Sequence, residues 1–358
     1  MPTIPTLPEI DASTVTTTRI TTRVLFSGPD NGIPVLFLHG NLMTGTCWEE
    51  VMLDLPMGYR GIAPDQRGYG DADSTKKIDA TRGLGDFSDD AVALLDHLGV
   101  EKAHIVGHSL GGSVVWRLLM DHPGRFLTAT QVAPASPYGF SGTKDVAGTP
   151  CHADFAGSGS SFMDPEAIRC LREGDRGMDS PFSPRSMLHT LIVKPPFIPE
   201  REEELVSAML SAHLGEQGYP GDFVPSPNWP YASPGKWGPL NALSLKYTPS
   251  VERLYAADPK TTILWVRGIH DLIVSNHSVY DPATAGAQGL LPDWPGTDVY
   301  PPQPMEDQIR SVLKSYVAAG GTCREVALST GHFPYLEQPA AFNEVFHAHI
   351  HWQSLAGR

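Results

Sequence analysis

Cysteines, basic residues and long apolar runs are all scarce in this chain, and each shortage excludes a class of protein. The 358 residues contain four cysteines, and no two of them form a CxxC pair, so neither a disulfide framework nor a zinc site is expected. Free thiols in a cytoplasmic protein are the favoured interpretation, and a bridge between Cys151 and Cys170 is left open. No apolar run reaches the ~18 residues that a membrane-spanning helix needs.

Positive charge is also in short supply. The chain has 26 lysines and arginines against 40 aspartates and glutamates, which gives a net charge of −14. Proteins that bind nucleic acid or dock on an anionic membrane normally carry a basic surface, so neither partner is expected. The first eight residues have no basic region and no apolar stretch, so we expect a proline-rich arm there rather than a signal peptide.

Short apolar segments, by contrast, are frequent and regularly spaced. Hydrophobic residues make up 41% of the chain, enough for a large core without disulfides or metals. Apolar and β-branched runs predict strands at 13–27, 34–38, 59–65, 103–106 and 126–132. Helical spacing predicts helices at 44–55, 86–98 and 113–122. This alternation predicts an α/β fold with a parallel sheet that has helices on both faces.

The alternation stops near residue 135. Residues 136–249 are irregular and rich in proline, glycine and serine, and helical spacing returns there only near 165–172 and 201–214. A passive loop of that length is unexpected in a compact domain, so we interpret the segment as a cap. The pattern resumes with a strand at 261–266, an irregular loop at 275–304, a helix at 305–319, a strand at 323–328 and a helix at 338–350. The expected parts are an arm with the first strand (1–23), a core (24–135 and 250–358) and the cap (136–249).

A G-x-S-x-G motif, Gly107 to Gly111, lies between a predicted strand and a predicted helix. In such a tight turn the two glycines leave room where β-carbons would clash. The turn presents Ser109 at the carboxyl end of the sheet and the amino end of the next helix, where free N–H groups and positive potential favour an oxyanion. Ser109 is therefore the predicted nucleophile.

A serine hydroxyl needs an adjacent base that a third group orients. His332 is the best candidate because it follows the last strand at the same end of the sheet. Asp271 is the predicted acid, just past the strand 261–266 and between serine and histidine in chain order. His270 is a weaker rival base, and we expect the His108 side chain to point elsewhere.

An oxyanion also needs two preorganised N–H donors. We expect one from the backbone of Leu110, directly after the nucleophile, and one from the backbone of Asn41, in the loop after the first buried strand. The Asn41 amide would add a polar group to the site. His39 is expected to brace that loop.

Taken together, the chain resembles the α/β-hydrolase-fold serine hydrolases of the capped, esterase and epoxide-hydrolase-like branch. The matching motifs are His39–Asn41, Asp65–Gly70, Gly107–Gly112, Gly268–Asp271 and Gly331–His332. The resemblance implies an eight-stranded, mostly parallel sheet and no metal or organic cofactor. Epoxide hydrolases and haloalkane dehalogenases use a carboxylate nucleophile, so Ser109 disfavours both activities.

The expected activity is two-step acyl transfer on an ester or lactone of a medium-sized, largely apolar small molecule. The aromatic residues predicted to line its pocket are Tyr138, Phe140, Trp229 and Trp237. Three alternatives remain: carbon–carbon bond cleavage by the same triad, transfer of the acyl group to a second substrate in place of water, and a non-catalytic small-molecule receptor. The loop 275–304 has two expected roles, closing the pocket or joining two copies of the chain in a homodimer.

Overall fold

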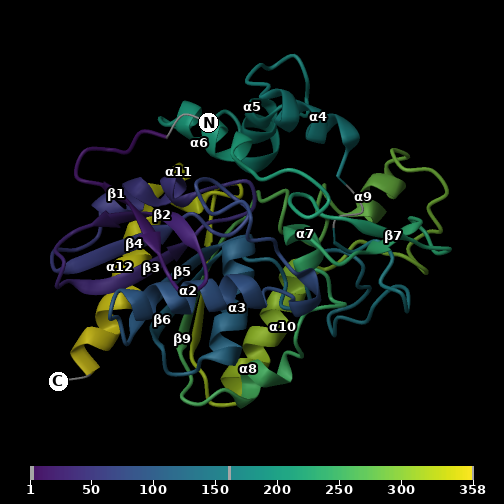
Figure 1. Ribbon diagram of the computed structural model, residues 1–358. Coiled ribbons are helices and arrows are strands. Elements are labelled where there is room, and N and C mark those ends of the chain that lie inside the picture. The colour runs from purple at the N-terminus through teal and green to yellow at the C-terminus, as the bar shows by residue number, and fades with distance from the viewer. Residues whose placement is uncertain (1–3, 160–162, 357–358) are drawn as a thin grey trace.

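A computed structural model describes residues 4–159 and 163–356, and eight strands of these segments form one sheet (Figure 1). Its strand order is β1-β2-β4-β3-β5-β6-β9-β10. The strands are β1 (Asp11–Thr16), β2 (Thr21–Ser27), β3 (Ile33–Leu38), β4 (Tyr59–Pro64), β5 (Ala103–His108), β6 (Phe126–Val132), β9 (Thr262–Gly268) and β10 (Cys323–Leu328). The sequence predicts one or two strands over 13–27, and the structure has two, joined by a turn.

The sheet is parallel except at one edge. β1 pairs with β2 and β2 with β4 in antiparallel register, whereas every pair from β4 across to β10 is parallel. Every residue of β5 is buried, as expected for a strand that helices cover on both faces. The structure therefore confirms the predicted eight-stranded, mostly parallel α/β sheet.

Two sets of helices cover the sheet (Figure 1). One face carries α2 (Gly85–His97), α3 (Leu110–Asp121), α8 (Glu252–Ala256) and α10 (Met305–Ala318). On the other, α1 (Glu49–Leu53) packs beside α12 (Pro339–Ala356), where Asn343 donates to Asp54. Short helices complete the loops, namely η1 (Gly45–Trp48), η2 (Ala80–Arg82) and α11 (Pro334–Glu337).

The segment 136–249 contains only short elements, and α4, α5 and α6 lie together above the sheet in Figure 1. They are α4 (Pro165–Glu173), α5 (Pro184–Met187), η3 (Leu188–Ile192), α6 (Glu202–Leu210), α7 (Pro239–Ala242) and the β7–β8 hairpin (Phe223–Pro225 and Ala232–Pro234). The predicted helix at 165–172 corresponds to α4. The one predicted at 201–214 corresponds to α6, which ends four residues earlier.

The loop 275–304 forms one helix, α9 (Pro282–Ala287), and packs on segment 136–249. The Trp229 indole donates to the Pro292 carbonyl over 2.9 Å, and its ring meets Tyr300 edge to face with centroids 4.9 Å apart. Tyr300 in turn donates its hydroxyl to the Ala156 carbonyl. Aromatic contacts of this kind fix the path of the loop.

All four cysteines lie within the described residues as free thiols, so Cys151 and Cys170 do not form a bridge. No helix within 4–159 or 163–356 is long and apolar enough to cross a membrane. The same residues contain no group of histidine, cysteine and carboxylate side chains that could hold a metal ion.

Candidate active site

Ser109 occupies a strained turn between β5 and α3, with φ 53° and ψ −117°. A β-carbon on Gly107 would lie 2.4 Å from the Gly111 carbonyl oxygen, and one on Gly111 would lie 2.2 Å from the Leu38 carbonyl oxygen. Both positions therefore require glycine. A positive φ at a serine costs free energy, and the surrounding backbone must hold it in place.

Asp271 and His332 follow β9 and β10, and their side chains form a buried pair. His332 Nδ1 lies 2.7 Å from Asp271 Oδ2. The other carboxylate oxygen, Oδ1, accepts the backbone N–H groups of Ile273 at 2.8 Å and Val274 at 3.0 Å. Because both carboxylate oxygens accept hydrogen bonds, the contact favours the tautomer that carries the proton on Nδ1 and leaves Nε2 free to accept one.

A cavity of about 130 Å³ joins the serine to the histidine. Ser109, Leu110, Asn41 and His332 all line it, while Asp271 lies behind the histidine. The structure thus brings together the five residues that the sequence predicts for a catalytic site. They meet because the carboxyl ends of parallel strands lie at one edge of the sheet.

The loop that carries His332 is anchored on both sides. The His332 N–H donates to the Ile192 carbonyl over 2.7 Å, and Glu337 Oε2 accepts the N–H groups of Gly331 and Lys194. Burial raises the pKa of the Glu337 carboxyl. Segment 136–249 and the histidine loop therefore share one hydrogen-bonded junction.

The two rival histidines have different surroundings. His108 lines the cavity, and its Nε2 lies 2.9 Å from the His332 carbonyl oxygen. Burial lowers the pKa of His108 well below its usual range, so the ring is neutral. His270 is exposed and lies beside Ser329, outside the cavity lining.

The loop after β3 is braced from the loop that contains Asp65–Gly70. His39 Nε2 accepts the Gln66 N–H over 2.8 Å, and Tyr69 donates its hydroxyl to Asn41 Oδ1 over 2.7 Å. The Asn41 amide also hydrogen-bonds Tyr219. The structure confirms that His39 braces this loop, and it shows that the Asn41 side chain does so as well.

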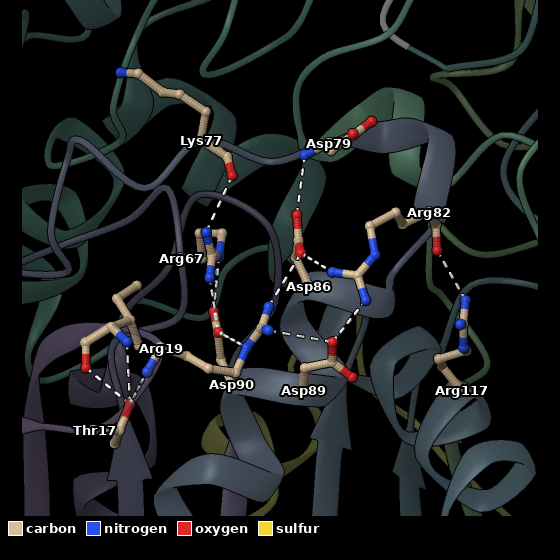
Figure 2. Close-up of polar contacts among 11 residues, drawn as sticks. Thr17, Arg19, Arg67, Lys77, Asp79, Arg82, Asp86, Asp89, Asp90 and Arg117 are labelled. Carbon is tan, nitrogen blue, oxygen red and sulfur yellow. Dashed lines mark hydrogen bonds and ion pairs between the residues drawn. The ribbon is translucent and has the colours of Figure 1, made fainter.

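A cluster of ion pairs holds the Asp65–Gly70 loop to α2 (Figure 2). Arg67 binds both carboxylate oxygens of Asp90, each over 2.7 Å, and donates to the Lys77 carbonyl. Arg19 bridges Asp90 and Asp86 over 2.8 and 3.2 Å. A bidentate guanidinium fixes orientation as well as distance, so the loop that braces Asn41 is itself rigidly attached.

Of the four aromatic residues predicted to line the pocket, the structure places only Phe140 in the cavity wall. Trp229 packs on the loop 275–304 instead, and Tyr138 packs over Gly148. Trp237 lies beneath the Lys236 ammonium, 4.7 Å from the ring centroid. Trp229 thus packs segment 136–249 onto another loop, whereas these contacts of Tyr138 and Trp237 lie within the segment. A sequence pattern cannot distinguish such packing residues from lining residues.

Sequence reasoning missed the methionines of the cavity. The described wall includes four of them, Met43, Met163, Met187 and Met209, together with Tyr219 and Tyr280. No periodicity marks these positions, because they are scattered along the chain from residue 43 to residue 280. The motif Asp65–Gly70, in contrast, was a visible signal for the bracing by Gln66 and Tyr69.

Comparisons with known proteins agree with this architecture. A family model described as the alpha/beta hydrolase fold matches residues 33–148. The chain is 38% identical over 121 residues to epoxide hydrolase 2 of Siraitia grosvenorii, and 32% identical over 117 residues to an uncharacterized carboxylesterase of Bacillus subtilis. These matches cover 33% of this chain in both cases, and 36% and 38% of the two relatives.

A solved structure matches over nearly the whole chain. The crystal structure of a Bacillus subtilis carboxylesterase superposes with a TM-score of 0.55 at 18% identity, covering 96% of this chain and 92% of that one. At such identity the likeness concerns the fold alone. The strand order and the family match point the same way. The chain therefore has the α/β-hydrolase fold, and part of it is similar in sequence to an epoxide hydrolase and a carboxylesterase.

Proposed function

We propose that this protein is a serine hydrolase that cleaves an ester or lactone bond of a medium-sized, largely apolar small molecule through an acyl-enzyme on Ser109. The observation that carries the proposal is the buried His332–Asp271 pair opening onto the same cavity as a strained serine. The epoxide-hydrolase relatives suggest another substrate. A hydroxyl nucleophile in place of a carboxylate favours acyl transfer.

In the first step, His332 Nε2 takes the Ser109 proton while the serine oxygen attacks the substrate carbonyl carbon. Asp271 holds the imidazole tautomer and stabilises the imidazolium that forms. The tetrahedral intermediate collapses, the carbon–oxygen bond to the alcohol breaks, and His332 returns its proton to the departing oxygen. The products of this step are the free alcohol and an acyl-serine ester.

The developing oxyanion would be stabilised by the N–H groups of Leu110 and Asn41. Leu110 is the first residue of α3, so its N–H has no acceptor within the helix. The Asn41 loop lies close to the serine, since a β-carbon on Gly40 would come within 3.1 Å of Ser109 Cβ. Each such donor typically lowers a barrier by about 2.7–4 kcal/mol.

In the second step, His332 takes a proton from water as the water oxygen attacks the acyl carbon. The bond between that carbon and the Ser109 oxygen then breaks, His332 returns the proton to the serine oxygen, and the acid leaves. Segment 136–249 would act as the cap that covers the cavity during both steps. Its Ile192 carbonyl and Lys194 N–H already engage the histidine loop and the Glu337 carboxylate. An apolar wall would limit access of bulk water to the acyl-enzyme.

A fluorophosphonate probe tests the proposal directly, with the adduct located by peptide mass. We expect one adduct on Ser109, absent in Ser109→Ala and in His332→Ala. Ser113→Ala is the matched control, because this buried serine lies one turn further along α3 and outside the cavity lining. A folded wild-type protein that forms no adduct and hydrolyses no ester would refute the function.

A further inference from the structure

Within the described residues, three hydroxyl groups of the cavity wall lack a strong hydrogen-bond acceptor. Besides the catalytic residues, His108 and Asn41, the polar side chains of the wall are Ser141, Tyr219 and Tyr280. Tyr219 donates its hydroxyl only to a sulfur, Met163 Sδ over 3.4 Å, but a second hydrogen bond ties it to the Asn41 amide that supports the loop after β3. Ser141 and Tyr280 therefore remain as hydroxyls with no role in bracing the site.

Ser141 is buried, with 2% of its surface exposed, and its Oγ has no partner among the described residues. Its backbone has φ 63°, in the left-handed region that a serine rarely adopts. A buried unsatisfied hydroxyl and a left-handed backbone each destabilise the fold. Their coincidence at a residue of the cavity wall indicates a role in binding.

Tyr280 comes from the loop 275–304 and donates its hydroxyl to the Met187 sulfur over 3.7 Å. A thioether is a weak acceptor, so a substrate oxygen would replace it favourably. Burial raises the pKa of Tyr280 to about 12, which keeps the proton available at neutral pH. Both partners of this weak contact line the cavity.

The segments that carry Ser141 and Tyr280 are fastened together. The Gln303 side-chain amide donates to the Gly139 carbonyl over 3.2 Å, and its backbone N–H donates to Asp281 Oδ2 over 3.1 Å. Gln303 thus links a residue two positions from Ser141 to the residue next to Tyr280. Hydroxyls held by a rigid scaffold can recognise a substrate group at low entropic cost.

We propose that Ser141 and Tyr280 form an oxygen-binding subsite, so that the preferred substrate carries a hydrogen-bond-accepting oxygen, a carbonyl or an ether, on the part that fills the cavity. The inference rests on the proposed function, because it describes the substrate of that same cavity. A plain hydrocarbon chain would leave the Ser141 hydroxyl unsatisfied, and a site of this kind discriminates against such an analogue.

Matched esters test the subsite. 4-Nitrophenyl heptanoate is compared with its 4-oxo, 5-oxo and 6-oxo analogues and with the 5-oxa ether, which separate a carbonyl from an ether and locate the oxygen. We expect kcat/KM for at least one oxygenated ester to exceed that for heptanoate by about tenfold. This ratio should fall towards one in Ser141→Ala, where alanine keeps the β-carbon and its backbone strain, and fall in Tyr280→Phe.

Ser88→Ala is the matched control, because Ser88 is also a buried serine with an unpartnered hydroxyl among the described residues, but it lies on α2. Its ratio should equal that of the wild type. A wild-type ratio near one for every oxygen position, or a high ratio kept in both cavity variants, would overturn the subsite while leaving the hydrolase standing.

If no ester is hydrolysed and no probe adduct forms, the proposed function fails and binding decides the subsite. The methyl esters of the same acids are then titrated against Ser109→Ala by calorimetry. Tighter binding of an oxygenated ester, lost in Ser109→Ala/Ser141→Ala, supports the subsite, and equal binding of all esters refutes it.

Discussion

The cavity has two sides that are built differently. Its floor consists of loops that follow strands of the sheet, and the floor side chains Asn41 and His332 are both engaged in hydrogen bonds, with His39 bracing one of these loops from behind. Its roof comes from segment 136–249 and the loop 275–304, where Ser141 has no partner within the described residues and Tyr280 meets only a thioether. The difference is what the proposed function and the proposed subsite require, namely a floor preorganised for catalysis and a roof whose hydroxyls a substrate would satisfy.

The floor should dominate catalysis. Ser109→Ala is expected to lower kcat by about 10⁶-fold. Asp271→Asn should lower it by about 10⁴-fold, because an amide cannot hold the same tautomer of His332. Steady-state kinetics on an ester that the wild type hydrolyses measure both values. Residual kcat within tenfold of the wild type in either variant would remove the triad from the mechanism.

The support beneath the floor should be costly to break. Arg67→Ala removes the bidentate partner of the Asp90 carboxylate, which is 11% exposed and keeps Arg19 as its remaining cation. Because the charge stays paired, we expect the free energy of unfolding to fall by about 1.5–3 kcal/mol, the contribution of charge-assisted hydrogen bonds. Urea unfolding measures the loss.

Arg169→Ala is the control for that loss. Arg169 is 44% exposed and pairs with Glu166 on the surface of α4, and exposed pairs contribute about 0–1 kcal/mol. If the two variants lose equal stability, the cluster in Figure 2 has no special structural role.

Acid should weaken the floor through His39. Burial lowers the pKa of His39 from 6.5 to about 4. The neutral ring therefore contributes stability that is complete above pH 6.5 and is lost as the pH falls towards 4, because the unfolded chain binds the proton first. We expect this group alone to lower the free energy of unfolding by about 1.4 kcal/mol per pH unit in that window.

Unfolding in urea at about pH 7 and about pH 4.5 measures this loss in the wild type and in His39→Gln. Glutamine can still accept the Gln66 N–H but does not titrate. Its loss between the two conditions should be about 2 kcal/mol smaller than that of the wild type. Identical losses would show that His39 does not titrate as described.

The roof should tolerate change and respond in selectivity. Met209→Leu keeps the volume of a cavity residue but stiffens it, so the ratio of kcat/KM between short and long acyl esters should shift by about two- to fivefold. Met120→Leu, a buried methionine on α3 outside the cavity lining, should leave that ratio unchanged. A larger effect from Met120→Leu would mean that the roof does not determine the selectivity for acyl-chain length.

The local sequence pattern identified residues correctly wherever the backbone conformation or complete burial restricts which residue types fit. Gly107 and Gly111 are visible in the sequence because the turn excludes a β-carbon, and β5 is visible because every one of its residues is buried. Asp271 and His332 were found because parallel strands place their following loops at one edge. The structure places both residues beside the serine turn, in agreement with the prediction.

The sequence pattern did not identify the residues that line the cavity, because packing between distant segments determines which side chains face it. Trp229 and Phe140 are both aromatic residues of segment 136–249, yet only Phe140 lines the cavity, because Trp229 is held by Pro292 and Tyr300 from another loop. The unsatisfied hydroxyl of Ser141 had no signal in the sequence at all.

The sequence by itself determined the order of strands and helices, the strained serine turn and the three candidate residues of the triad. These follow from local steric limits and from the periodicity of burial, which a linear pattern records. Only the tertiary structure decided which side chains face the cavity, how the Asp65–Gly70 loop braces Asn41, and that Ser141 and Tyr280 lack good acceptors. Those features depend on contacts between segments far apart in the chain, and no local pattern encodes such distances.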